Sequence, residues 1–166
     1  MDYDGRVYSY GILIFGDNFY PQNILKKIQG NFVIDDDYFC PTDVRKFWGG
    51  IISDDDDIYG YGCMLFSHPL KQATDKYRFK YEKKFVEFIE ENYQLFKENG
   101  VDDIRIFMEV FYEGQCNFEI FNKTLLKRLA KYNVSLPISI YAFPKRKMQK
   151  WEKEINVIWE SVNVFD

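Results

Sequence analysis

The sequence predicts a single α+β domain, in which a mixed or mainly antiparallel sheet of about five strands packs against one long helix and one or two shorter ones. Three observations support this. Short segments rich in aromatic and β-branched residues are bounded by turn residues, as strands are. Between them lie segments with apolar residues at helical spacing. The chain has 166 residues, 46% apolar and 19% aromatic, which suits one domain, 1–166, whose core fills without disulfides or metal.

Five segments have the strand pattern. They are Val7–Phe15, Ile58–Ser67, Ile104–Tyr112, Cys116–Phe121 and Val134–Ala142, with a further short strand near Arg45–Ile52. We expect Pro69 to end the second strand, and a turn at Glu113–Gly114–Gln115 to return the chain from the third strand to the fourth. Pro137 cannot donate a backbone hydrogen bond, so it places the last strand at an edge or a bulge.

Apolar spacing predicts the helices. A short helix should begin at Pro21 and end at Gly30. The long helix Lys76–Glu98 has an apolar stripe and an opposite face of Lys and Glu. Helix Thr124–Tyr132, capped by Asn122, should lie on the same face of the sheet. A C-terminal helical extension is expected over about 145–162.

The acidic residues are clustered. The net charge is −4, and seven of the 26 acids lie in two runs, Asp35–Asp37 and Asp54–Asp57. The other 19 acids face 22 bases, so the acidity is local and would attract a basic partner. No broad basic stripe with interleaved aromatic residues is present, which disfavours nucleic acid as a partner.

The cysteines and the hydropathy pattern predict the compartment. Cys40, Cys63 and Cys116 are widely spaced and odd in number, as free thiols in a reducing compartment are. The N-terminal residues lack the pattern of a secretory signal, and no apolar run approaches the ~20 residues that span a bilayer. We therefore expect a cytoplasmic protein with no membrane partner.

The sequence contains no catalytic or metal-binding set. His68, the only histidine, precedes Pro69 and is expected at a strand end near solvent, so that replacing it with Ala should leave function intact. The run Asp54–Asp57 fails the calcium-loop pattern, because a loop starting at Asp55 has Phe66 where the twelfth position needs Glu. We expect no catalytic residues, no metal and no cofactor.

The order of elements and several short motifs resemble the bacterial domain-of-unknown-function family numbered four-two-seven-nine. The similarity covers about residues 7–143. It rests on the residues Phe15–Phe19 with Pro21, Pro41–Thr42, Phe47–Gly49, Tyr59–Phe66, Gly114–Gln115 with Asn117, Leu125–Leu126, Leu129–Ala130, Val134 and Ile140–Tyr141. The resemblance implies an α+β fold and supplies no catalytic residues. The chain departs from the family pattern in the stretched link Asn31–Cys40 and in the segment after Pro144.

Together these features favour a non-catalytic protein-binding domain, and specifically a bacterial immunity protein that neutralises a toxin. An acidic surface is suited to the basic active site of a nuclease toxin, with aromatic residues as anchors. The expected partner-binding residues are Asp35, Asp36, Asp37, Asp54, Asp55, Asp56, Asp57, Phe39 and Trp48. Two alternatives stay open: a small enzyme using Asp, Glu and Tyr chemistry, and a structural or self-associating domain.

Overall fold

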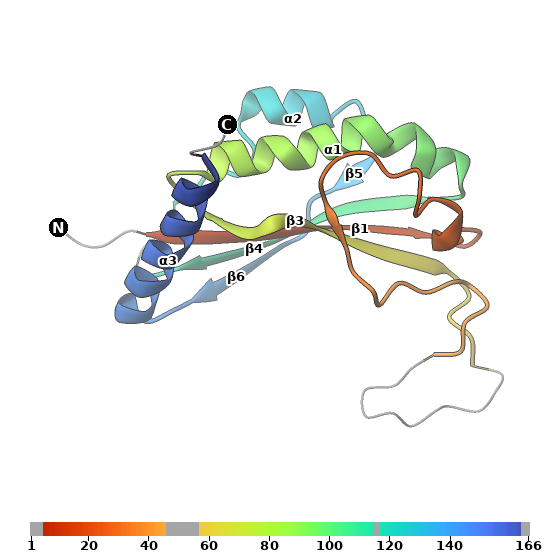
Figure 1. Ribbon diagram of the computed structural model, residues 1–166, viewed down its shortest axis with the longest axis horizontal. Helices are drawn as coiled ribbons and strands as arrows, with labels where there is room; N and C mark the ends of the chain where they lie inside the picture. Colours follow the sequence, from red (N-terminus) through yellow and green to blue (C-terminus); the bar gives the residue numbers. More distant parts are fainter. Residues whose placement is uncertain (1–4, 46–56, 115–116, 164–166) are drawn as a thin grey trace.

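The protein is described by a computed structural model that covers residues 5–45, 57–114 and 117–163. Its centre is a six-stranded sheet in the order β2-β3-β1-β4-β5, with β6 also paired to β4 (Figure 1). The strands are β1 (Arg6–Gly16), β2 (Val33–Ile34), β3 (Gly62–Thr74), β4 (Asp103–Tyr112), β5 (Val134–Ser135) and β6 (Ile138–Ala142). Pairing is antiparallel from β2 to β4, whereas β5 and β6 run parallel to β4. The predicted α+β class is confirmed.

The two central strands present one apolar face to the core. Alternate residues of β1 are buried, among them Tyr8, Tyr10 and Ile12, and the paired strand β4 contributes Ile106 and Met108 to the same layer. Because successive side chains of a strand point to opposite faces, this alternation gives the sheet one face for the helices. The predicted strands Val7–Phe15 and Ile104–Tyr112 are thereby confirmed.

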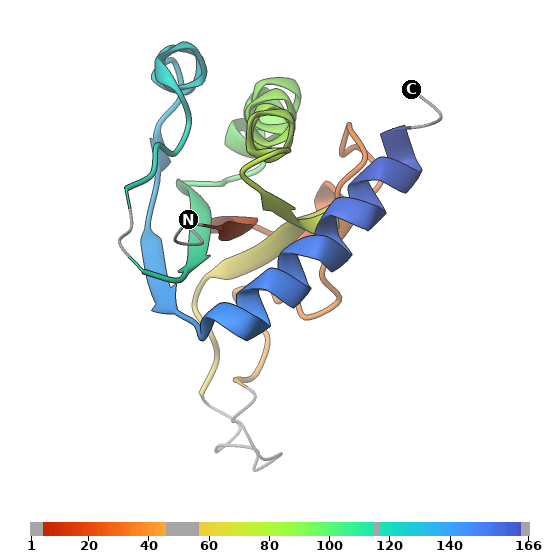
Figure 2. The same ribbon diagram turned by 90° about the vertical axis from the view of Figure 1, so that its left-hand side faces the viewer.

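Two helices cover that face. Helix α1 (Arg78–Glu98) lies along the sheet, and the shorter α2 (Lys123–Leu129) lies beside it (Figure 2). The predicted capping is confirmed, since the side chain of Asn122 accepts hydrogen bonds from the amides of Thr124, at 3.1 Å, and Leu125, at 3.0 Å. The placement of both helices on one face follows the prediction.

The C-terminal helix α3 (Lys145–Asn163) crosses the end of the sheet (Figures 1 and 2). Its buried residues are Met148, Ile155 and Trp159. The indole of Trp159 donates to the carbonyl of Gln72 in β3 at 2.9 Å, and the indole of Trp151 donates to the side chain of Gln72 at 3.1 Å. These bonds fix α3 to β3.

Two of the expected elements differ from the structure, and a third cannot be compared with it. The helix expected from Pro21 to Gly30 is only a 3-10 helix, η1 (Pro21–Asn23), followed by turns. A single turn is enough to bury Ile24, and an isolated helix of the expected length would have little stability of its own. Residues 117–121 form no strand, because the edge of β4 that a returning strand would need is occupied by β5 and β6. The strand expected near Arg45–Ile52 lies almost wholly outside the described residues.

The expected end of a strand at Pro69 is wrong. Strand β3 continues to Thr74 and accommodates Pro69 in a bulge. Ser9 of β1 faces Gln72 and Gly11 faces Ser67, so two steps along β1 correspond to five along β3. A bulge leaves backbone amides unpaired, and proline, which has none, is tolerated there.

The edge position expected from Pro137 is confirmed, but the single strand expected over Val134–Ala142 is divided there into two. The break separates β5 from β6, and both strands lie on the outer side of β4. The carbonyl of Pro137 accepts a hydrogen bond from the amide of Met108 at 2.9 Å, so the interrupted edge stays attached to the sheet.

Candidate functional site

An aromatic cluster lies at the start of β3. The ring of Phe39 stacks on that of Tyr59 with 3.7 Å between centroids, and Tyr61 contacts Phe39 edge-on at 5.3 Å. Phe39 is held there by two backbone hydrogen bonds with Cys63, of 3.0 and 3.1 Å. All three rings are half-buried, so part of each surface is open to a partner.

The first aspartate run lies beside this cluster. The amide of Asp35 donates to the carbonyl of Leu65 in β3 at 3.0 Å, and its side chain accepts from the amide of Asp37 at 2.9 Å. The turn therefore has a defined conformation, while Asp36 and Asp37 are exposed. We call Asp35, Asp36, Asp37, Phe39, Tyr59 and Tyr61 the acidic–aromatic surface.

The second aspartate run is described only at its last residue. Asp57 forms an ion pair with Arg45 at 3.4 Å, so part of its charge is neutralised within the chain. Trp48 and Asp54–Asp56, which were also expected to bind a partner, lie outside the described residues. Of the predicted site, the structure thus brings together the Asp35–Asp37 run and Phe39.

A second polar cluster is closed to solvent. Glu82 is completely buried; it accepts a hydrogen bond from the hydroxyl of Tyr10 at 3.1 Å and pairs with Arg78 at 3.1 Å. Burial raises the pKa of Glu82, and the neighbouring guanidinium opposes that rise. An enzyme working through Asp, Glu and Tyr would need such a carboxyl group at a pocket. This one joins α1 to β1 beneath the surface.

His68 is not at a strand end near solvent, as the sequence suggested. It lies in the β3 bulge with 9% of its surface exposed, and its ring is packed against Phe32, Tyr81 and Trp159. Its Nδ1 accepts a hydrogen bond from the amide of Leu70 at 3.1 Å, so the proton of the neutral ring is on Nε2. Proline directly after the histidine, within an otherwise regular strand pattern, was the available signal for a bulge.

Burial also determines the charge of this histidine. Desolvation, with a further contribution from the positive charge of Lys84, lowers the pKa of His68 to about 4. The imidazole is therefore neutral at pH 7, where it offers one hydrogen-bond donor and no charge.

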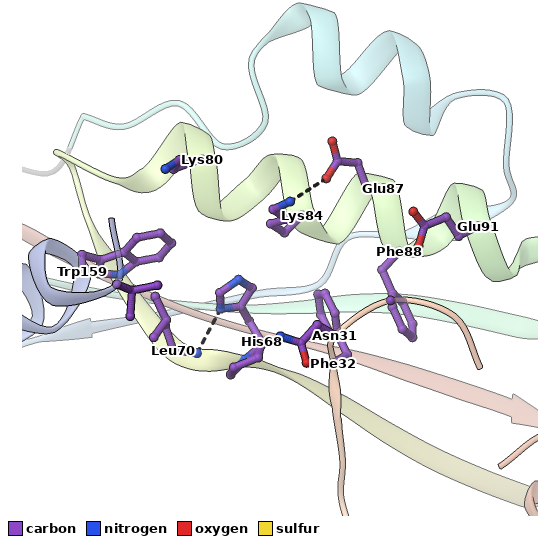
Figure 3. Close-up of a pocket in the computed structure, with 13 residues that line it drawn as sticks. Asn31, Phe32, His68, Leu70, Lys80, Lys84, Glu87, Phe88, Glu91 and Trp159 are labelled. Carbon is purple, nitrogen blue, oxygen red and sulfur yellow. Dashed lines mark hydrogen bonds and ion pairs between the residues drawn. The ribbon is translucent and has the colours of Figure 1, made fainter. Parts of the chain in front are cut away.

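A pocket of about 450 Å³ opens above His68 (Figure 3). Four parts of the chain form it: the bulge of β3, helix α1, helix α3 and the loop at residues 30–32. Its polar side chains include Lys84 and Glu87, which form an ion pair at 3.3 Å. Such a pocket is not visible in the sequence, because its walls come from segments far apart in the chain.

Neither a cluster of metal ligands nor a bilayer-spanning helix occurs in the described ranges. Among those residues, no group of three or more His, Cys, Asp or Glu side chains is placed to hold a metal ion. Within the same residues, no helix combines the length and the hydropathy of a bilayer-spanning segment.

Comparison with known proteins gives no relative: no family model matches the sequence, and neither a curated protein nor a solved structure matches the chain. The resemblance to the family of unknown function remains a prediction.

Proposed function

We propose that this chain is a non-catalytic protein-binding domain whose partner docks on the acidic–aromatic surface. The observation that carries the proposal is that the exposed Asp36 and Asp37 lie three and two residues before Phe39, whose ring stacks on Tyr59. Aromatic side chains supply most of the binding energy in many interfaces, and surrounding charges direct association.

The charge on this surface is available to a partner. Among the described residues, neither Asp36 nor Asp37 forms an ion pair with a Lys or Arg side chain. The backbone bonds from Asp35 and Phe39 to β3 hold the surface in one conformation, so little conformational entropy is lost on binding. A rigid, negative, partly aromatic surface is suited to a basic partner.

The partner class that we favour is a toxin with a basic active site, such as a nuclease, which would make the protein a cytoplasmic immunity protein. The active site of such an enzyme must attract phosphate groups. An acidic surface that blocks it competes with the substrate and associates quickly through electrostatic steering.

The test is binding to the product of the adjacent gene, measured by surface plasmon resonance with the double variant Asp36→Asn, Asp37→Asn. We expect association roughly tenfold slower at low salt, with the difference shrinking as ionic strength rises. The control variant, Glu98→Gln with Glu154→Gln, makes the same charge change on exposed helix positions and should bind normally. An equal decrease of the association rate in both variants, or no decrease in the Asp36→Asn, Asp37→Asn variant, would contradict a local acidic docking surface.

One observation favours self-association as a second candidate function. The outer strand β6 has Ile138 and Ile140 at 48% and 53% exposure, and the residues Ile138–Ala142 carry no charge. Edge strands of this kind pair with other strands unless they are protected. Sedimentation at increasing concentration should show a dimer that Ile140→Lys abolishes; a monomer at all concentrations would eliminate this candidate.

A further inference from the structure

The β3 bulge creates a ligand-sized pocket away from the acidic–aromatic surface. The additional residues of the bulge displace His68 and Leu70 from the regular ladder, and Lys71 has the rare positive φ of 51°. Bulges and such backbone conformations concentrate at functional sites. The volume of about 450 Å³ is within the range of small-molecule sites, roughly 300–1,000 Å³.

The walls of the pocket suit a flat apolar group. The His68 ring forms the floor, packed between Phe32, at 5.7 Å between centroids, and Trp159, at 5.8 Å. Leu70, Phe88 and Val162 complete the apolar lining. Planar rings pack against aromatic side chains with centroid separations of about 4.5–7 Å.

One end of the pocket offers hydrogen-bond donors. Because Nδ1 of His68 accepts from Leu70, Nε2 carries a proton, and no described residue accepts it. Figure 3 shows this second ring nitrogen turned toward α1, where Lys84 lies, with Lys80 one turn earlier on the same side. The ion pair of Lys84 with Glu87 lies at the surface, with 57% and 29% of the two side chains exposed, so its net contribution is small and a ligand could replace it.

Two acidic residues also line the pocket. Glu91 lines the opposite end of the pocket, beside Gly30, and Figure 3 shows the carboxylate of Glu87 directed away from His68. The end that contains His68 and Lys84 is therefore rich in hydrogen-bond donors, and an anionic group that takes the place of Glu87 beside Lys84 fits there.

We propose that this pocket binds a small aromatic carboxylate, with its ring against the apolar lining of Phe32, Leu70 and Val162 and its carboxylate bound by His68 Nε2–H and Lys84. Charge-assisted hydrogen bonds of this type are short and strong. The proposal departs from the expectation that His68 is dispensable, which assumed a solvent-exposed strand end. It is independent of the protein partner proposed above.

The test uses 1-naphthaleneacetate as the probe and its neutral analogue 1-naphthaleneacetamide as the matched ligand. Because His68 is the only histidine in the chain, its imidazole nitrogen signals in NMR report on this pocket alone. Binding of the carboxylate should be saturable and should shift the Nε2 signal. The amide should bind roughly tenfold more weakly.

Two exposed lysines of α1 provide the matched variants. Lys84→Gln should lower the affinity for the carboxylate about five- to tenfold and leave the affinity for the amide nearly unchanged. Lys83→Gln changes a neighbouring lysine that does not line the pocket, and should bind both ligands as the unmodified protein does. Equal affinity for acid and amide, an unmoved Nε2 signal, or no saturable binding at millimolar probe would overturn the proposal.

Discussion

Replacing Tyr81 with Phe tests how the β3 bulge is stabilised. The Tyr81 hydroxyl accepts a hydrogen bond from the amide of Tyr10 at 2.9 Å and donates one to the carbonyl of Lys71 at 2.7 Å. These two backbone groups lie where the pairing of β1 and β3 shifts register, so they lack their usual ladder partners. The hydroxyl oxygen of Tyr81, on α1, thus provides a hydrogen-bond partner for one backbone group of each strand at the bulge.

The expected cost follows from the burial of each group. The Tyr10 amide is buried, and a buried donor left without a partner costs about 1–3 kcal/mol. The bond to the Lys71 carbonyl is only partly buried, so water can replace Tyr81 there and the loss is nearer ~1 kcal/mol. We expect Tyr81→Phe to lower the free energy of unfolding by about 2–4 kcal/mol in total.

Urea denaturation measures this difference, and Tyr93→Phe is the control. Tyr93 is on the same helix and packs against Tyr132, but in the described structure its hydroxyl makes no hydrogen bond, so its loss should change stability by less than about 0.5 kcal/mol. Hydrogen exchange at the Tyr10 amide should also accelerate in Tyr81→Phe. A change below 0.5 kcal/mol with unaltered exchange at Tyr10 would refute the proposed role of Tyr81.

Three further predictions concern other buried groups. The pKa of His68 is near 4 in the folded protein and 6.5 as its ordinary value, so the unfolded state binds more protons between these values and stability decreases as the pH is lowered through that window. Relative to His68→Gln, the protein should lose about 2 kcal/mol of stability when the pH is lowered from 7.5 to 5. Parallel pH profiles for the two proteins would count against this. Glu82→Ala leaves Arg78 without its buried partner and should cost about 3–5 kcal/mol in chemical denaturation, and a cost below 1 kcal/mol would show that water replaces the carboxylate. Gly62→Ala places a methyl group 1.8 Å from the carbonyl oxygen of Phe19, and the backbone shift that this requires should lower the free energy of unfolding by at least about 1–3 kcal/mol. The change should be visible as a lower melting temperature. An unchanged melting temperature would show that the loop containing Phe19 moves freely.

Much of the fold is determined locally and could be predicted from the sequence. Strand β4 and helix α1 have clear periodicities, and each needs only one apolar face to define its orientation. The cap at Asn122 is equally local, because its hydrogen bonds reach only Thr124 and Leu125. The exposed aspartate run and Phe39 could also be predicted, because they follow one another closely in the chain.

Other features depend on long-range competition for partners. Residues 117–121 had an acceptable strand pattern, but strands β5 and β6 occupy the edge of β4 where that segment would have paired. Pro69 was expected to end the strand, but β3 continues past it in a bulge that depends on a helix elsewhere. Tyr81 of α1 supplies the hydrogen bonds that allow β3 to continue.

The α+β class, the helices on one face of the sheet and the local acidity could be predicted from the chain alone, because each follows from patterns within single segments. The burial of His68, the ion pair of Asp57 with Arg45 and the pocket between α1, α3 and β3 became visible only in the folded molecule. Burial, ion pairing and cavity shape depend on which distant segments meet. Periodicity within one segment contains no information about that choice.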